Sequence, residues 1–159
     1  GMVLGRVLDM EEAYTAVSWQ TVFLLACLIP LGMAMQQSGA AAYLAALALS
    51  FMDGFPIWGI QLFLAIIATV FTLVMSNVGA TVLLVPLAIQ MALGVGADPA
   101  IFALTIALAT SNSFLLPTHQ VNALIMGPAG YKVKDFMKAG SGMTLLFLIV
   151  MMLMLNFFY

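Results

Sequence analysis

Two short polar stretches interrupt long apolar runs in this 159-residue chain. The first, residues 76–79 (Ser-Asn-Val-Gly), follows a mostly apolar run over residues 55–75. The second, residues 117–122 (Pro-Thr-His-Gln-Val-Asn), follows another such run. Lipid cannot hydrogen-bond a freed amide or carbonyl, so backbone at membrane depth stays helical unless protein, water or a ligand satisfies it. Two such breaks therefore indicate a site for a transported ion or solute.

Composition indicates which solvent the chain folds in. Apolar residues make up 65% of the sequence, charged residues only 6%, and the mean hydropathy is +1.19, values typical of an all-α integral membrane protein. Cys27 is the only cysteine, so one chain cannot form a disulfide or a thiolate metal cluster. The few charged residues lie almost wholly at predicted loop positions, and they indicate no nucleic-acid partner.

Helical rise and the thickness of the bilayer divide the chain into spans and shorter arms. We expect a cytoplasmic or interfacial lead-in (1–18) followed by a membrane transport repeat (19–159). The repeat is expected to consist, in order, of a span (19–36), an arm (39–52), a re-entrant hairpin (55–94), a broken span (99–126), a cytoplasmic loop (127–140) and a final span (141–159). The second hairpin arm, taken as residues 80–93, offers only about 21 Å of helix, so we expect it to turn back rather than cross. Pro117 is expected to interrupt the broken span, because its ring removes an amide donor and disfavours helical geometry at Leu116.

Basic residues set the expected orientation, since they concentrate on the cytoplasmic side of a membrane. An even number of predicted crossings places all four on that side: Arg6, Lys132, Lys134 and Lys138. Asp53 and Asp98 then face outward. The expected location is the cell inner (plasma) membrane, crossed several times.

The first break offers ligand-binding groups. Ser76 and Asn77 carry a hydroxyl and an amide, and a helix starting near Gly79 directs unpaired amides and the positive end of its dipole at the same point. The alternative is a Ser/Asn kink that bonds its own helix and supports packing. Residues 110–113 are polar too, and for most of them we expect a packing role.

The second break holds the only ionisable group inside the apolar body, His119, beside Thr118, Gln120 and Asn122. Intramembrane ionisable residues are functional candidates. His119 has three readings: a donor to an anionic substrate, a group that takes part in proton coupling, or a structural histidine that satisfies a buried carbonyl.

Three stretches together resemble the C-terminal half of a divalent anion:sodium symporter, a member of solute carrier family 13 in the ion transporter superfamily. They are residues 19–39, the run Ser-Asn-Val-Gly-Ala-Thr-Val-Leu-Leu-Val-Pro at 76–86, and residues 114–123, which begin with Phe-Leu-Leu-Pro and are followed by residues 127–140. The resemblance implies one of two inverted repeats, each with a re-entrant hairpin and an unwound helix around sodium ions and a divalent oxyanion. Two departures are Val78, where the family has threonine, and residues 118–121, where Thr-His-Gln-Val replaces Ala-Thr-Pro-Pro with one residue missing.

The resemblance also implies which residues bind. The substrate-binding residues would be Ser76, Asn77, Thr118, His119 and Asn122, and the cation-binding residues would be Ser76, Asn77, Gly79 and Thr118. The implied ligands are sulfate or a dicarboxylate, with sulfate slightly favoured, and sodium as the coupling ion, with no other cofactor or metal.

The sequence therefore predicts part of a secondary active transporter that needs an N-terminal repeat absent from these residues. Gly1 before Met2 favours a segment of a longer permease, which can form a homodimer. The alternatives are a non-transporting membrane subunit and a proton-coupled or arsenite-type carrier of the same superfamily. No Ser/His/Asp set or intramembrane carboxylate pair occurs, so an enzyme is not expected.

Overall fold

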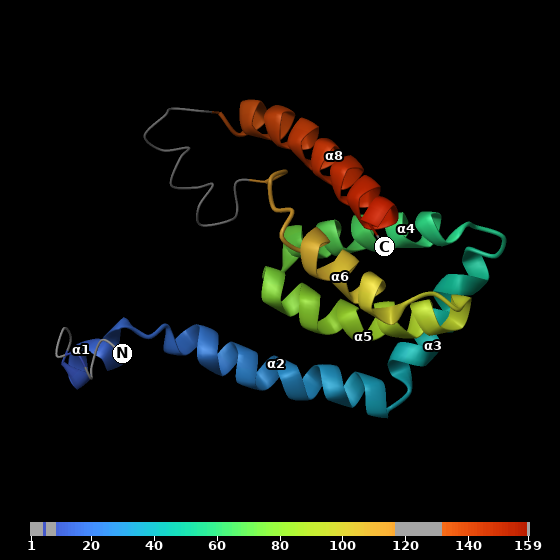
Figure 1. Cartoon of the computed structure of the whole chain (residues 1–159). Coiled ribbons are helices and arrows are strands. Elements are labelled where there is room, and N and C mark those ends of the chain that lie inside the picture. Colours follow the sequence, from blue (N-terminus) through green and yellow to red (C-terminus); the bar gives the residue numbers. More distant parts are fainter. Residues whose placement is uncertain (1–4, 6–8, 117–131, 159) are drawn as a thin grey trace.

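The structure, a computed structural model, describes residue 5, residues 9–116 and residues 132–158, and the described part is helical (Figure 1). Its helices are α1 (Met10–Ala16), α2 (Trp19–Gln37), α3 (Ala40–Phe51), α4 (Ile57–Val74), α5 (Asn77–Val95), α6 (Pro99–Ala109) and α8 (Val133–Phe158). The prediction of an all-α membrane protein is thereby confirmed. In hydrocarbon this outcome follows from composition, because a helix satisfies its backbone groups within one segment.

Helices α4, α5 and α6 form the body of the molecule, lying beside one another with alternating chain direction (Figure 1). Helix α3 packs on α5, and α8 packs across α4 and α6. Small residues let the helices approach closely, and alanines make up much of the buried core. The buried core residues are Ala45, Met52, Ile60, Leu64, Ala65, Ala68, Leu84, Ala88, Met91, Ala92, Phe102, Ile106, Ala109, Met151 and Leu155.

Helix α2 stands apart from this body and meets it along α5. Gly32 is the close point, where an added Cβ would lie 3.1 Å from Val82 Cγ1 and 3.2 Å from the Val82 carbonyl oxygen. Four residues after Val82, Pro86 has no amide to offer that carbonyl. The Val82 carbonyl therefore lacks a helical amide partner because of Pro86, and α2 can approach it because residue 32 has no side chain.

Helices α2 and α3 form a pair bent by 67° between Val22–Gln37 and Ala40–Phe51. The bend occurs at Ser38 and Gly39, and Gly39 caps α3 with a φ of +75°, a left-handed conformation that glycine adopts without steric cost. The sequence predicted an interfacial or connecting arm at 39–52, and the structure contains a separate helix, α3, over Ala40–Phe51.

Within the residues that the structure describes, three helices are long and apolar enough to cross a membrane, α4, α5 and α8, and the bent α2–α3 pair would make a fourth span if counted as one. The expectation that the arm after Ser76 is too short to cross is wrong for α5, which runs from Asn77 to Val95. It starts three residues earlier than expected because Ser76 caps it. Helix length therefore does not by itself require the α4–α5 pair to re-enter.

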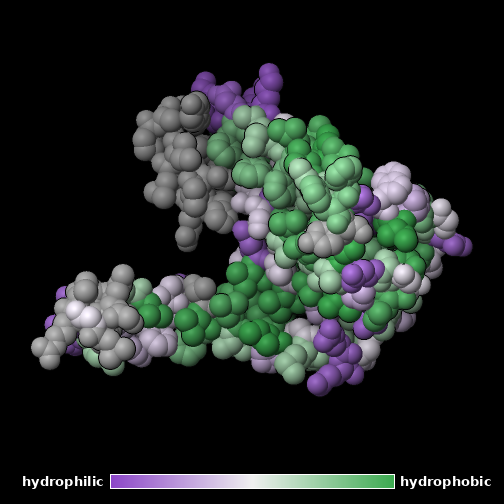
Figure 2. Space-filling model, viewed as in Figure 1, coloured by the Kyte–Doolittle hydropathy of each residue, from purple (hydrophilic) through white to green (hydrophobic). Residues whose placement is uncertain are grey.

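Helix α8 also begins earlier than expected, at Val133 inside the predicted cytoplasmic loop 127–140. Lys134 and Lys138 are exposed in its first turns, so the helix continues beyond the apolar segment with its charges in solvent. Figure 2 shows hydrophobic residues over much of the visible face, with hydrophilic patches near the start of α8 and at several other edges of the molecule.

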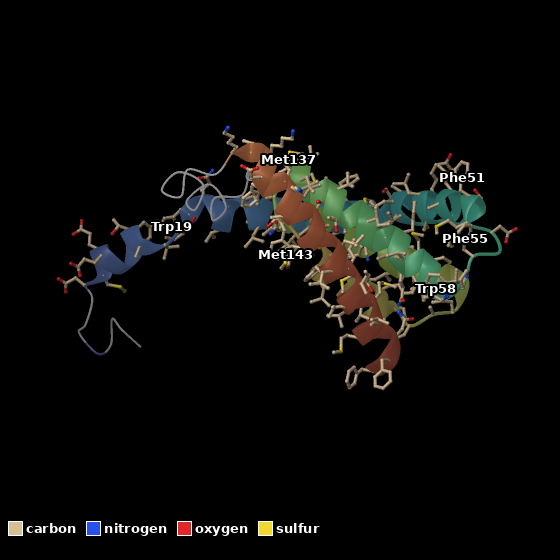
Figure 3. The ribbon with its side chains drawn as sticks, turned by 90° about the horizontal axis from the view of Figure 1, so that it is seen from above. Trp19, Phe51, Phe55, Trp58, Met137 and Met143 are labelled. Carbon is tan, nitrogen blue, oxygen red and sulfur yellow. The ribbon has the colours of Figure 1, made fainter. Side chains whose placement is uncertain are left out.

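Aromatic residues gather where α3 passes into α4: Phe51, Phe55 and Trp58 lie at one end of the molecule in Figure 3. All three are more than half exposed. Such rings are typical of a membrane–water boundary. The described part of the chain thus has a lysine-bearing end at the start of α8 and an aromatic end at the start of α4.

Candidate functional site

The first predicted break is present and short. Helix α4 ends at Val74, Met75 and Ser76 are extended, and α5 begins at Asn77. Ser76 is the N-cap of α5, and its hydroxyl oxygen accepts a hydrogen bond from Gly79 N at 3.1 Å. This bond satisfies one of the amides that a helix N-terminus leaves unpaired. The backbone amides of Asn77 and Val78 lie between Ser76 and Gly79, at the positive end of the α5 dipole.

The second break begins earlier than expected. Helix α6 ends at Ala109 with Thr110 as its cap, so the prediction that Pro117 interrupts the helix is wrong about the position. The hydroxyl of Thr110 donates to Ile106 O at 3.0 Å, and that of Ser111 donates to Ala107 O at 3.2 Å. Side-chain hydroxyls that bond nearby backbone carbonyls compete with continuation of a helix. The polar run that starts at Thr110 therefore ends α6 before the proline is reached.

Threonine hydroxyls join the two breaks. Thr72 on α4 donates to Thr110 O at 3.1 Å, and Thr81 on α5 lies with its Oγ1 2.7 Å from Thr110 Oγ1. One turn deeper, Thr69 donates to Ala65 O at 2.8 Å and approaches Ala109 O at 3.5 Å. Both helices of the α4–α5 pair are thus hydrogen-bonded to the end of α6.

Asn112 lies in the irregular segment after α6 and is fully buried, with 0% of its surface exposed. Its Nδ2 donates to Thr69 Oγ1 at 3.5 Å, while its Oδ1 is buried without a hydrogen-bond partner in the described part of the chain. Buried acceptors are usually paired. The packing role expected for residues 110–113 is therefore present, but at Asn112 it is incomplete.

On the side facing away from α4 and α5, the segment after α6 packs against α8. Gly140 lies so close to Phe114 that an added Cβ would contact the Phe114 carbonyl oxygen and lie 2.9 Å from its carbon. The Phe114 and Phe147 rings meet edge to face with centroids 6.1 Å apart, a favoured aromatic geometry. The segment is thus held between the α4–α5 pair and α8.

A cavity of about 410 Å³, here called the tip cavity, opens where the start of α5 meets the end of α6 and α2. Its lining residues are Leu25, Asn77, Val78, Thr81, Val82, Ala107, Thr110 and Ser111. A second hollow of about 310 Å³ shares Thr81 and Val82 and continues between α2 and α5. Figure 1 shows these helix ends at the same side of the body. The tip cavity combines a mostly apolar wall with a few converging polar groups, as ligand sites usually do.

The structure places three of the predicted site residues together. Ser76, Asn77 and Gly79 form the first turn of α5, and Asn77 lines the tip cavity, while Gly79 is buried. Thr118, His119 and Asn122 lie outside the described residues. Sequence reasoning gave no role to Thr69 and Thr72, which look like tolerated polar residues within an apolar run.

The sequence of the chain is similar to those of known transporters. The sequence profile of a family described as citrate transporter matches residues 1–107, about two thirds of the chain. The chain belongs to the citrate transporter family. Members of this family are transporters rather than enzymes, as the sequence indicated.

Curated relatives match this citrate-family chain over nearly its whole length. An uncharacterized transporter of Synechocystis, sll0640, is 33% identical over 99% of the chain. Sodium-dependent high-affinity dicarboxylate transporter 3 of Caenorhabditis elegans is 29% identical over 96%, and solute carrier family 13 member 1 of Rattus norvegicus is 30% identical over 92%. The predicted resemblance to solute carrier family 13 is thereby confirmed. The matches cover 26%, 27% and 25% of those relatives, so the chain spans about a quarter of their length.

Proposed function

We propose that this chain forms one half of a secondary active transporter that carries a divalent oxyanion across the inner (plasma) membrane with sodium as the coupling ion. A second repeat of inverted orientation would complete the site. In this proposal, the α4–α5 pair is a re-entrant hairpin with its tip at Ser76, and the segment after α6 is the unwound part of a broken span. The observation that carries the proposal is the meeting of these two helix breaks at one partly polar cavity.

Charge balance supports sodium coupling. The sequence has no lysine or arginine from residue 19 to residue 131, so this region offers a dianion no fixed positive side chain. Moving uncompensated charge into a low-dielectric site is costly. The start of α5 supplies a partial positive charge, and cotransported cations would supply the remainder. The C-terminal end of α6 and its freed carbonyls are the kind of group that coordinates such cations.

The anion would be held by amides and hydroxyls. Asn77 is half-buried in the wall of the tip cavity, and its side-chain amide makes no hydrogen bond within the described residues. The backbone amides that follow Ser76 can bind a carboxylate or a sulfate equally well. The names of the matching family and of the worm relative favour a di- or tricarboxylate. We therefore place succinate and citrate before sulfate as substrates. Ser76, Thr118, His119 and Asn122 are proposed as further anion contacts, and Ser76, Asn77, Gly79 and Thr118 as cation contacts.

The test is uptake of radiolabelled succinate, citrate and sulfate into proteoliposomes that contain this chain together with the second repeat. We expect uptake of at least one anion to depend on an inward sodium gradient. Asn77→Ala should raise the KM for that anion about 10-fold, because a hydrogen bond to a charged group is lost. Asn156→Ala is the matched control, since Asn156 on α8 donates to Gln61 Oε1 on α4 and to Met152 O on its own helix, away from the tip cavity.

Other outcomes would contradict specific parts of the proposal. Absence of uptake for all three anions would favour the non-transporting subunit. Uptake that ignores sodium but follows a proton gradient would replace sodium by protons as the coupling ion. A His119→Ala variant with wild-type affinity would remove His119 from the site.

A further inference from the structure

Two side-chain hydroxyls meet in the wall of the tip cavity. Thr81 comes from the second turn of α5 and Thr110 from the cap of α6, and their Oγ1 atoms are 2.7 Å apart. Thr81 is half-buried, whereas Thr110 is only 1% exposed and lies behind it. The pair thus has an outer and an inner member relative to the cavity.

The pair has more acceptors than protons. Thr81 Oγ1 lies 2.8 Å from Asn77 O, and Thr110 Oγ1 lies 3.0 Å from Ile106 O and 3.2 Å from Ala107 O. Together with the contact between the two hydroxyls, this makes four possible hydrogen bonds for two protons. At least two of the four are unmade at any moment. The hydroxyls can therefore exchange partners without leaving a donor unpaired.

Turning a hydroxyl away from its carbonyl costs little here. Ile106 O also accepts the Thr110 backbone amide at 2.9 Å, and Asn77 O is the i−4 helical partner of the Thr81 amide. Each carbonyl keeps its amide when the hydroxyl rotates. A chain of hydroxyls that donate in one direction also polarises each member and strengthens the last bond.

We propose that Thr81 binds the transported oxyanion by donating a hydrogen bond to it, and that Thr110 positions Thr81 by donating to its Oγ1. This inference rests on the proposed function. Val78 and Thr81 both line the tip cavity, and residues three apart share one face of a helix. The hydroxyl missing at Val78 is thus supplied one turn later along α5.

The test is equilibrium binding of labelled succinate, citrate and sulfate, at saturating sodium, to the complete transporter in nanodiscs. Thr81→Val keeps the branched shape but removes the donor, and it should weaken anion binding about 10-fold. Thr81→Ser should bind like the wild type. Thr110→Val should weaken binding by a smaller factor, because only the hydrogen bond from Thr110 to Thr81 Oγ1 is lost.

Thr105→Val is the matched control. Thr105 is a buried threonine of α6 whose hydroxyl donates to Ile101 O at 2.8 Å, away from the tip cavity. It should leave the Kd unchanged. The double variant Val78→Thr/Thr81→Val moves the hydroxyl back by one turn and should recover most of the lost affinity.

These outcomes separate the inference from the proposed function. If the wild type binds none of the anions, the proposed function fails. If the wild type binds an anion and Thr81→Val binds it equally well, or if the double variant recovers nothing, only the role of Thr81 fails. A loss in Thr81→Ser as large as in Thr81→Val would show that the side chain acts by packing and would also overturn the inference.

Discussion

Replacing Gly140 by alanine tests whether α8 holds the irregular segment after α6. In any helix interior, Gly→Ala gains about 1 kcal/mol of helix propensity. At position 140, however, the new Cβ meets the Phe114 carbonyl group and lies 3.2 Å from Leu115 Cα. These are backbone atoms and cannot rotate away, so either α8 or the segment must shift. Such overpacking costs about 1–3 kcal/mol, which cancels or outweighs the gain.

Gly142 provides the matched control on the same helix. A Cβ added there would meet nothing within 4 Å, so Gly142→Ala should keep the full propensity gain. The free energy of unfolding in mixed micelles should therefore differ by about 1–3 kcal/mol between the two variants, with Gly140→Ala the less stable. Trp58 lines a cavity of about 370 Å³ with Met152 and Phe157 of α8, so its fluorescence reports on detachment of this helix. Equal stability of the two variants would refute the close contact at Gly140.

Three further substitutions test individual hydroxyl groups by the same unfolding titration. Ser76→Ala removes the cap on Gly79 N and should cost about 1 kcal/mol; a change near zero would show that this cap does not stabilise α5. Thr144→Val removes a hydroxyl that is buried without a partner in the described part of the chain, so stability should stay equal or rise by up to about 1 kcal/mol. A clear loss would reveal an unseen partner. Thr72→Val breaks the bond to Thr110 O and should lower the free energy of unfolding by about 0.6 kcal/mol, the average for hydrogen bonds between membrane helices. A loss of several kcal/mol would mean that Thr72 does more than form one hydrogen bond between α4 and the end of α6.

The helical class and the approximate position of α2 followed from composition and run length, because hydrocarbon leaves the backbone few alternatives. Helix ends were harder to predict, since they depend on single side chains. Ser76 extends α5 by capping it, Thr110 and Ser111 shorten α6, and Lys134 lies in a helical turn that its charge led us to interpret as loop.

For the candidate site, the sequence identified the residues at the α5 tip but not those behind it. Ser76 and Asn77 are distinctive because they interrupt an apolar run. Thr72 is not, since a lone threonine in a membrane helix ordinarily bonds its own preceding turn, and Thr81 drew notice only as a replacement for the hydroxyl that Val78 lacks. Their contacts with Thr110 depend on which helices pack together, and that follows from the tertiary fold rather than from any local pattern.

The meeting of α2 and α5 at the Val82 carbonyl links two distant positions. Pro86 withholds the amide that would pair with this oxygen, and Gly32 lets α2 cover it. A proline on a face of α5 that no other helix covers would leave that carbonyl facing lipid tails, whereas a larger residue at 32 would push α2 away from the Val82 carbonyl. Among homologous sequences, we therefore expect positions 32 and 86 to covary, with larger residues at 32 accompanying loss of the proline.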